Sequence, residues 1–245
     1  LVGSEMCIRD RTRAVESMGL HADMTAGLSL GEYCAIAVAG GMCDLDAIRT
    51  VRSRGIFMEH AAPEGSGAMS AVLGMDASVI ENVLNGREGV SIANYNCPGQ
   101  IVITGEAAAV AEAGTALKEA GARRVLPLKV SGPFHSPMMR PAGEELAKVF
   151  AGVSMNPLKV PYVANINAEV ITDCGRIEGL LVDQVSGSVH WQQSVETMLR
   201  ESVDTFVEIG PGKTLTGFLR KIDKNVKAYH IGSWEEAVQV CEELK

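Results

Sequence analysis

Short apolar segments and segments of helical periodicity alternate along this chain, and that alternation limits the folds open to it more than anything else in the sequence. The clearest run lies between residues 68 and 130. Its elements follow in the order strand, helix, strand, strand, helix, strand, at 68–75, 77–85, 90–95, 100–105, 106–120 and 123–130. This βαββαβ order is the split pattern of ferredoxin-like domains.

The rest of the chain alternates in the same way. Further strand patterns are found at 160–166, 205–209 and 226–231, among helical patterns at 32–39, 45–62, 141–150, 177–184, 194–202, 214–222 and 234–244. Strands that alternate with helices predict a parallel sheet covered on both faces. The sequence therefore predicts an α/β protein with a large domain (12–65 and 132–245) and a small, ferredoxin-like domain (66–131).

The first eleven residues differ from everything that follows them. Leu1 to Arg11, LVGSEMCIRDR, has a mixed composition without a clean hydrophobic period. It resembles one reading frame of a transposase-type sequencing-library adapter. We therefore expect this stretch to be foreign to the protein and exclude it from the fold, as a fusion scar is excluded.

Composition and charge exclude several classes of protein. The chain carries 22 Lys and Arg against 30 Asp and Glu, a net charge of −8 without a basic tract, which argues against a nucleic-acid partner. Its longest nearly apolar run, Cys34–Cys43, is far shorter than the roughly 20 residues of a membrane span. The six cysteines form no CxxC pair and no Cys/His ligand spacing. We expect reduced thiols, no metal site and a cytoplasmic location.

One short motif carries candidate chemistry. Gly27-Leu28-Ser29-Leu30-Gly31 fits the pattern GxSxG and directly precedes the helix expected at 32–39. In this pattern the serine occupies a strained turn between a strand and a helix, and we expect a Cβ at either glycine to collide there. The hydroxyl then lies at a helix N-terminus, where free N–H groups stabilise a developing oxyanion. Ser29 is therefore a candidate nucleophile.

A serine nucleophile needs a base, and two of the five histidines are candidates. His135 lies in the segment SGPFHSPMM (131–139), a loop made rigid by two prolines. His230 follows the last expected strand and, with Asp204, gives the chain order Ser29, Asp204, His230 that is typical of α/β-hydrolases. The residues alone leave both mechanisms open.

Five sequence blocks, in this order and at this spacing, resemble the malonyl-CoA:acyl carrier protein transacylase family. The blocks are GLSLGEY (27–33), VRSRGIFM (51–58), NYNCPGQIVITG (94–105), GPFHSPMM (132–139) and VEIGPGKTLTGFLRK (207–221). The resemblance extends from about Ala22 to the C-terminus. It implies an α/β fold in which a hydrolase-like parallel sheet forms the large domain and a ferredoxin-like small domain is inserted.

The resemblance also implies an activity. It is the transfer of malonyl from coenzyme A, through a serine ester, to the phosphopantetheine thiol of acyl carrier protein in fatty-acid synthesis. Malonyl-CoA and acyl carrier protein are then the partners, and no cofactor or metal is implied. Two alternatives remain: an esterase that uses Ser29, Asp204 and His230, or a non-catalytic fragment that binds carrier protein.

Roles follow from the resemblance residue by residue. Ser29 is implied as the nucleophile and His135 as its base, which decides against His230. The backbone carbonyl of Gln184 matches the group that orients this histidine. Arg54 matches the arginine that grips the malonyl carboxylate, because its planar fork can bind both oxygens. The Leu30 N–H is implied as an oxyanion donor.

Further residues are implied in recognition. Asn94 and Asn96 fall in a pocket loop of the family, and Phe134 matches a bulky residue that favours malonyl over methylmalonyl. Basic side chains near one surface suit an acidic carrier protein; they are Arg220 and Lys221, with Arg123 and Arg124 close by.

Two departures from the family pattern stand out. Leu28 replaces a histidine that is frequent there; since that residue is not the base, we expect activity to survive. The family's opening GQGSQ segment, whose glutamine helps form the oxyanion hole, has no counterpart in the sequence. We expect that segment to have preceded Thr12, and hence an N-terminally truncated chain.

Overall fold

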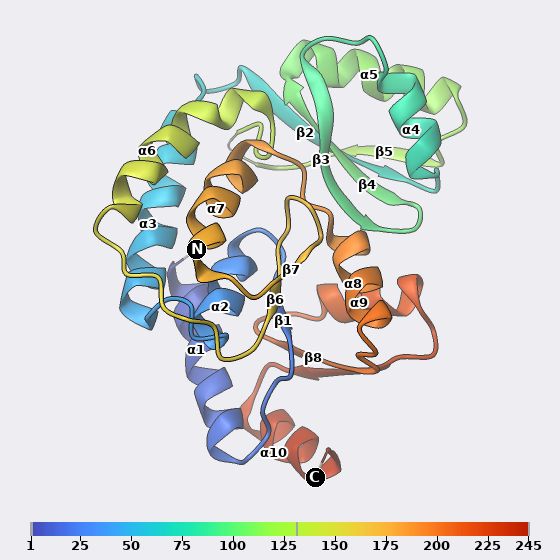
Figure 1. Ribbon diagram of the computed structural model, residues 1–245. Helices are drawn as coiled ribbons and strands as arrows, with labels where there is room; N and C mark the ends of the chain where they lie inside the picture. The colour runs from blue at the N-terminus through green and yellow to red at the C-terminus, as the bar shows by residue number, and fades with distance from the viewer. Residues whose placement is uncertain (1, 131, 245) are drawn as a thin grey trace.

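The computed structural model describes residues 2–130 and 132–244 as an α/β protein with three small β-sheets in that part of the chain. Residues 1, 131 and 245 lie outside the described residues. Residue 1 belongs to the expected adapter stretch, and residue 131 is the expected end of the small domain. Figure 1 shows the unit formed by residues 67–127 at one end of the molecule, with the helices and sheets of the remaining chain beside it.

The small unit is a four-stranded antiparallel sheet with the strand order β3-β4-β2-β5. Its elements are β2 (Gly67–Leu73), α4 (Ala77–Leu84), β3 (Val90–Cys97), β4 (Gln100–Glu106), α5 (Ala107–Glu119) and β5 (Arg124–Pro127). Each expected element is present, with ends shifted by at most a few residues. Both helices place apolar residues at helical spacing, Ile80 and Leu84 in α4 and Val110 and Leu117 in α5, and these bury a core against the strands.

A second core lies among four helices and a short sheet. The helices are α2 (Leu30–Val38), α3 (Asp44–His60), α6 (Arg140–Phe150) and α7 (Ile177–Ser186), with 3-10 turns at Pro137–Met139 and Cys174–Arg176. The strands are β1 (Thr25–Ala26), β6 (Tyr162–Val163) and β7 (Val170–Ile171), of which β1 and β6 are parallel. Tyr33, Ile36, Leu146 and Tyr162 are fully buried in this core.

The C-terminal part forms a third sheet of two parallel strands. Its elements are α8 (Trp191–Arg200), β8 (Thr205–Ile209), α9 (Thr214–Ile222), β9 (Lys227–Ile231) and α10 (Trp234–Glu243). The expected single parallel sheet is therefore found only as two separate parallel pairs, β1 with β6 and β8 with β9. One reason is visible after Val163: the chain turns back through a bond from the Ala168 N–H to the Ala164 carbonyl and returns as β7, so the strand expected over 160–166 is only two residues long.

The N-terminal helix α1 (Val2–Ser17) contains most of the stretch that we expect to be foreign. Its Glu5 is fully buried, and Arg9 donates to Asp44 at 2.7 Å. Helix α3 is capped by the Cys43 thiol, which accepts from the Asp46 N–H. Glu5 and Arg9 are thus packed within the structure, and the expectation that this stretch stands outside the fold is wrong. A helical conformation does not bear on where these residues originate, so their foreign origin stays a prediction.

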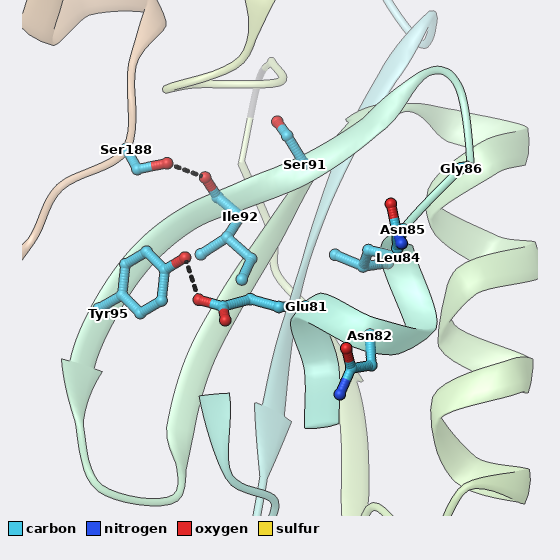
Figure 2. Close-up of a pocket in the computed structure, with 9 residues that line it drawn as sticks. All are labelled: Glu81, Asn82, Leu84, Asn85, Gly86, Ser91, Ile92, Tyr95 and Ser188. Carbon is cyan, nitrogen blue, oxygen red and sulfur yellow. Dashed lines mark hydrogen bonds between the residues drawn. The ribbon is translucent and has the colours of Figure 1, made fainter. Parts of the chain in front are cut away.

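Backbone bonds join the small unit to the segment that follows α7. Val189 forms a parallel bridge with Asn94 of β3: the Tyr95 N–H donates to the Val189 carbonyl at 2.9 Å, and the Val189 N–H donates to the Ala93 carbonyl at 2.7 Å. The Ser188 hydroxyl adds a bond to the Ile92 carbonyl (Figure 2). Among the residues described, no helix is both long and apolar enough to cross a membrane.

Candidate active site

Ser29 occupies a strained turn between β1 and α2. Its φ of 53° and ψ of −100° are unusual for a residue with a Cβ, and such a conformation costs on the order of 1–3 kcal/mol. A Cβ on Gly27 would lie 2.0 Å from the Gly31 carbonyl oxygen, which confirms why glycine is needed there. The same expectation is wrong for Gly31, where a Cβ would meet open space.

His135 reaches Ser29 from a loop far along the chain. The Ser29 Oγ lies 2.8 Å from His135 Nε2, and His135 Nδ1 lies 2.9 Å from the backbone carbonyl of Gln184. A carbonyl oxygen only accepts hydrogen bonds, so Nδ1 carries the proton and Nε2 is free to accept from the serine hydroxyl. The structure thus joins the three residues that the sequence proposed as nucleophile, base and orienting group.

The surroundings of His135 keep its imidazole neutral. Burial, and then the nearby Arg54 charge, lower the pKa of His135 from 6.5 to about 4, while the bond to the Gln184 carbonyl opposes that shift. A neutral imidazole at neutral pH has a lone pair ready for the serine proton. The group is therefore in the protonation state that a general base requires.

Arg54 extends from α3 into the same cluster. Its Nη2 donates both to Ser29 Oγ and to Gln184 Oε1, each at 3.0 Å. Its guanidinium carbon lies 5.7 Å from the centre of the Tyr33 ring, within cation–π range. The Arg54 side chain is almost fully buried, and its Nε has no hydrogen-bond partner within the described ranges. A buried cation with a free donor beside a nucleophile suits an anionic substrate group.

The N–H groups around Ser29 are mostly occupied. The Ser29 N–H donates to Asn165 Oδ1 at 2.6 Å, the Gly31 N–H to the Leu28 carbonyl, and the Glu32 N–H to the Ser29 carbonyl. The Leu30 N–H, at the first position of α2, finds no acceptor in the described part of the chain. It is therefore available to a developing oxyanion, the role that the family resemblance implies for it.

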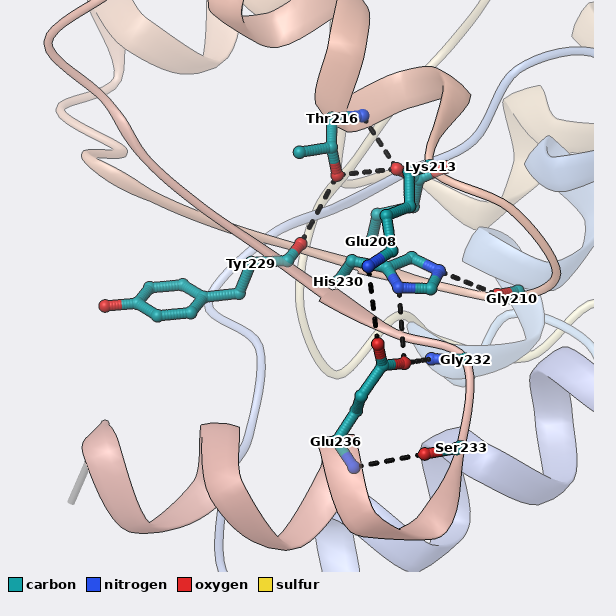
Figure 3. Close-up of polar contacts among 9 residues, drawn as sticks. All are labelled: Glu208, Gly210, Lys213, Thr216, Tyr229, His230, Gly232, Ser233 and Glu236. Carbon is teal, nitrogen blue, oxygen red and sulfur yellow. Dashed lines mark hydrogen bonds and ion pairs between the residues drawn. The ribbon is translucent and has the colours of Figure 1, made fainter.

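The other candidate histidine is engaged elsewhere. Figure 3 shows His230 between the Gly210 carbonyl, 3.1 Å from its Nε2, and Glu236, 3.3 Å from its Nδ1. Asp204 is exposed and accepts from the Thr205 hydroxyl. Neither residue bonds to Ser29, so the esterase arrangement that the sequence left open is not assembled here.

Three contributions to the cluster were missed from the sequence. Asn165 bonds both sides of the serine turn, Glu32 lies fully buried beneath it, and the Gln184 side chain bonds Arg54. Glu32 carries a usable signal, because it is the one charged residue of the apolar helix sequence LGEYCAIAV. Asn165 likewise follows a buried run, Tyr162 to Ala164, in which a polar side chain needs a partner.

The residues implied in recognition lie in three different places. Leu28, Leu30, Asn94 and Asn96 line a cavity of about 920 Å³, although Ser29 itself does not line it. Phe134 is half-buried and packs on two cores, that of α2, α3, α6 and α7 and the face of the small sheet that carries Met69, Ala71, Ala93 and Val102. The expected docking residues Arg123, Arg124, Arg220 and Lys221 are all exposed.

A second pocket, of about 530 Å³, lies on the small unit near α4 and β3 (Figure 2). The Tyr95 hydroxyl donates to the Glu81 carboxylate at its edge, at 2.8 Å. None of its lining residues is a histidine or an arginine, so it holds no counterpart of the Ser29 cluster.

Comparisons with known proteins agree with this geometry. The family described as "Acyl transferase domain" matches residues 11–240. The malonyl CoA-acyl carrier protein transacylase of Bacillus subtilis (strain 168) is 43% identical over 231 residues, which is 93% of this chain and 73% of that protein.

Solved structures give the same result. The acyl-carrier-protein S-malonyltransferase of Burkholderia pseudomallei 1710b matches with a TM-score of 0.94 and 36% identity, over 97% of this chain and 79% of that one. The complex PlMCAT:AntF, a type II PKS acyl-carrier protein with its malonyl-transacylase, matches with a TM-score of 0.91 and 36% identity, over 99% and 79% of the two chains. The chain therefore belongs to the malonyl-CoA:acyl carrier protein transacylase family, within the wider family of acyl transferase domains.

Proposed function

We propose that this chain transfers malonyl from coenzyme A to acyl carrier protein through an ester on Ser29. The observation that carries the proposal is the meeting of two groups, a base and a cation, at the oxygen of Ser29. Ser29 Oγ lies within hydrogen-bond distance of both a neutral, carbonyl-oriented His135 and the buried guanidinium of Arg54. Nucleophile, base and a cation for an acidic acyl group are the parts that this reaction needs.

The first half-reaction forms the ester. Ser29 Oγ attacks the thioester carbonyl carbon while its proton passes to His135 Nε2, and the carbonyl oxygen becomes an oxyanion facing the Leu30 N–H. The intermediate collapses as the carbon–sulfur bond breaks. The coenzyme A thiolate takes the proton from His135 and leaves, so malonyl remains on the serine and the base is neutral again.

The second half-reaction reverses these steps with a different thiol. The phosphopantetheine thiol of the carrier protein gives its proton to His135 and attacks the ester carbonyl carbon. The carbon–oxygen bond to Ser29 breaks, and the serine oxygen recovers the proton from His135. No redox change occurs, and every proton that leaves is returned.

Arg54 and Phe134 are proposed to select the acyl group. A carboxylate that binds Arg54 can take over the donor now directed at Ser29, and the free Nε gives the fork a second point of attachment, while the bond to Gln184 is kept. Phe134 directly precedes the base, and its ring fills the space between the two cores. A bulky ring there disfavours a branched acyl group, by about 1–3 kcal/mol for one methyl.

The carrier protein is proposed to dock where α9 meets the small sheet. Lys221 Nζ donates to Gln100 Oε1 at 3.3 Å, at the turn between β3 and β4. Gly74 links Arg123 to the same turn, because its N–H bonds to the Gly99 carbonyl and its Cβ position lies 2.7 Å from the Arg123 Cβ. Positive side chains from distant segments thus share one edge, which suits an acidic partner.

The domain organisation is part of the proposal. The strand order β3-β4-β2-β5, for strands met along the chain as β2, β3, β4 and β5, supports a ferredoxin-like small domain over about 66–131. The parallel pairs β1 with β6 and β8 with β9 support a hydrolase-like arrangement of the large domain over 12–65 and 132–245.

One experiment tests the function directly. The protein is incubated with radiolabelled malonyl-CoA, digested and mapped, and then offered carrier protein that bears phosphopantetheine. We expect label on the peptide that contains Ser29, no label in Ser29→Ala, and transfer of the label to the carrier. Label on another residue, or an ester that hydrolyses without passing to the carrier thiol, would refute the proposal.

A further inference from the structure

Glu32 lies three residues after the nucleophile, in the first turn of α2, and is fully buried. Taking a carboxyl group out of water is costly unless it is bonded, and the surrounding residues of α2, Tyr33 to Ala37, are also buried. An apolar residue would pack at this position without that cost. The hydrogen bonds of Glu32 indicate why a carboxyl group is buried at this position.

Two amide groups meet at a single oxygen of Glu32. Its Oε2 accepts from Gln184 Nε2 at 2.7 Å and from the backbone N–H of Asn165 at 3.3 Å. Both partners continue to the serine turn, since Gln184 Nε2 also donates to the Ser29 carbonyl at 2.9 Å. Glu32 is therefore the point from which two arms extend to the nucleophile.

The first arm, through Asn165, clamps the turn. Asn165 Oδ1 accepts from the Ser29 N–H at 2.6 Å, and its Nδ2 donates to the Gly27 carbonyl at 2.7 Å. These bonds connect the two sides of a backbone that is held at a φ of 53°. A strained conformation persists only where its surroundings fix it.

The second arm, through Gln184, holds the cation. Gln184 Oε1 accepts from Arg54 Nη2 at 3.0 Å, while its backbone carbonyl meets His135 Nδ1 at 2.9 Å. One residue thus positions both the base and the arginine. The bond from Gln184 to Glu32 fixes which way its amide points, because the nitrogen must face the carboxyl oxygen and the oxygen must face Arg54.

We propose that Glu32 is a positioning residue for acyl transfer, which through Asn165 fixes the nucleophilic turn and through Gln184 fixes the substrate arginine. The inference rests on the function proposed above. It needs only one acceptor oxygen on the side chain, because Oε1 has no hydrogen-bond partner in the described part of the chain. Burial raises the pKa of Glu32 to about 8, so the protonated carboxyl, which keeps one acceptor, is the major form at neutral pH.

Two substitutions separate positioning from packing. Glu32→Gln keeps an acceptor oxygen at the place of Oε2 and puts its amide nitrogen where Oε1 now lies without a partner. Glu32→Leu keeps the volume but removes the acceptor. A displacement of about 1 Å at a reacting group can lower a rate by about 100-fold. We expect Glu32→Leu to lose on that order in the rate of Ser29 acylation and Glu32→Gln to restore most of it.

Comparing acyl donors separates the two arms. In Glu32→Leu, kcat should fall with acetyl-CoA, because this donor has no carboxylate and only the nucleophilic turn is disturbed. With malonyl-CoA, KM should rise as well, because Arg54 is no longer held. Asn165→Leu breaks the first arm alone and should lower kcat for both donors alike. Gln184→Met spares the backbone carbonyl but removes the bonds of the side chain to Arg54 and to the Ser29 carbonyl. It should lower kcat for both donors and, unlike Asn165→Leu, also raise KM for malonyl-CoA.

A matched control comes from another partly buried glutamate. Glu208 accepts from the Thr216 N–H and hydroxyl at the start of α9 (Figure 3). It also accepts from the Leu215 N–H, so its role is structural. Glu208→Leu should lower Tm while leaving the acylation rate of the folded protein unchanged. If Glu32→Leu behaves like this control, or if Glu32→Gln loses as much rate as Glu32→Leu, the inference is wrong.

A second probe keeps this test separate from that of the proposed function. A fluorophosphonate reacts with an activated serine whatever the natural acyl group. If the wild type reacts with the probe but not with malonyl-CoA, the proposed function fails, and the order of probe rates among the variants still decides the role of Glu32. If Glu32→Leu does not fold, the single-arm variants Asn165→Leu and Gln184→Met carry the test. The inference is overturned if these two variants change kcat and KM in the same way as each other for both acyl donors.

Discussion

Under the proposed function, Arg54 would link substrate binding to the chemistry at Ser29. In the free protein it donates to the serine oxygen, and its charge contributes to the lowered pKa of His135. A malonyl carboxylate bound to the guanidinium would neutralise part of the field that His135 senses. The pKa of His135 would then rise, and with it the affinity of Nε2 for the serine proton. The correct substrate thereby strengthens the base that acts on it.

Replacing this arginine should therefore separate two acyl donors. Arg54→Ala is expected to lower kcat/KM for malonyl-CoA by about 10- to 100-fold, because a charge-assisted bond is lost. Acetyl-CoA, which has no carboxylate, should lose much less. The measurement is the pair of specificity constants, and an equal loss for both donors would show that Arg54 only supports the structure.

The two histidines should respond differently to truncation. His135→Ala removes the base that contacts Ser29 and should lower acyl transfer by about 100- to 10,000-fold. His230→Ala removes contacts with Gly210 and Glu236 only and should retain most of the transfer. Rates are compared per folded protein, with circular dichroism of both variants as the control. The reverse pattern would favour the esterase hypothesis.

At the scale of elements, the loop that carries His135 rests on the first residue of β2. A Cβ built on Gly67 would lie 2.3 Å from the Pro133 ring, two residues before the base. Gly67→Ala should therefore push this loop, lower the acylation rate and leave the fold of the small sheet intact. The control is Gly86→Ala in the same unit. Its positive φ makes the added Cβ a strain on the backbone, but that Cβ meets open space, so the control disturbs the small unit without pushing the loop of His135. A Gly67→Ala enzyme with the wild-type rate would contradict this account of the loop.

Helix α9 is expected to steer the carrier protein. Reversing the charges in Arg220→Glu/Lys221→Glu should raise KM for the carrier protein and leave KM for malonyl-CoA unchanged. The difference should shrink as salt is added, because screening weakens attraction between exposed charges. Steady-state kinetics at two ionic strengths check this. Equal changes for both substrates would indicate damage to the fold.

Much of the element order could be predicted from the sequence, and the reasons are local. Strand β8 and helix α9 begin and end where their periodicity predicts, and the βαββαβ run is complete. Sheet connectivity could not be predicted in this way, because strand pairing joins distant segments such as Thr25 with Tyr162. The single expected parallel sheet is correspondingly absent from the described residues.

The candidate site likewise contains residues that a local motif reveals and residues that only contacts between distant segments reveal. Ser29 was recognisable because its motif is contiguous, whereas His135 was preferred to His230 only through the resemblance of the block GPFHSPMM to the family. The clamp at Asn165 was not, since it acts across 136 positions of sequence and resembles any buried asparagine until its partner is known. Periodicity reports which face of an element is buried, but it carries no information about which buried polar groups meet.

For the molecule as a whole, the site imposes a pH dependence on stability. The pKa of His135 is about 4 in the folded state and 6.5 in its ordinary environment, so the unfolded chain binds a proton that the folded one does not. Titration of His135 therefore leaves the free energy of unfolding unchanged above about pH 6.5 and lowers it as pH falls from about 6.5 to about 4, by on the order of 1 kcal/mol per pH unit.

Denaturant titrations at several pH values check this effect. Wild type and His135→Gln should differ in free energy of unfolding by an amount that changes in favour of the variant as the solution is acidified through that window. A constant difference between the two proteins from pH 7 to pH 4 would show that His135 does not titrate with a lowered pKa.

The bridge between Asn94 and Val189 has a consequence for motion. Its N–H groups, those of Tyr95 and Val189, tie the free edge of the small sheet to the segment that follows α7. If the small unit swung open during turnover, these two amide protons would exchange with deuterated solvent together and much faster than those inside β4. If the Tyr95 and Val189 amides are protected from exchange as strongly as those of β4, the small unit does not swing open. Substrates would then enter a gap of fixed width, and side-chain rotations rather than a moving lid would control the entry and exit of thioesters.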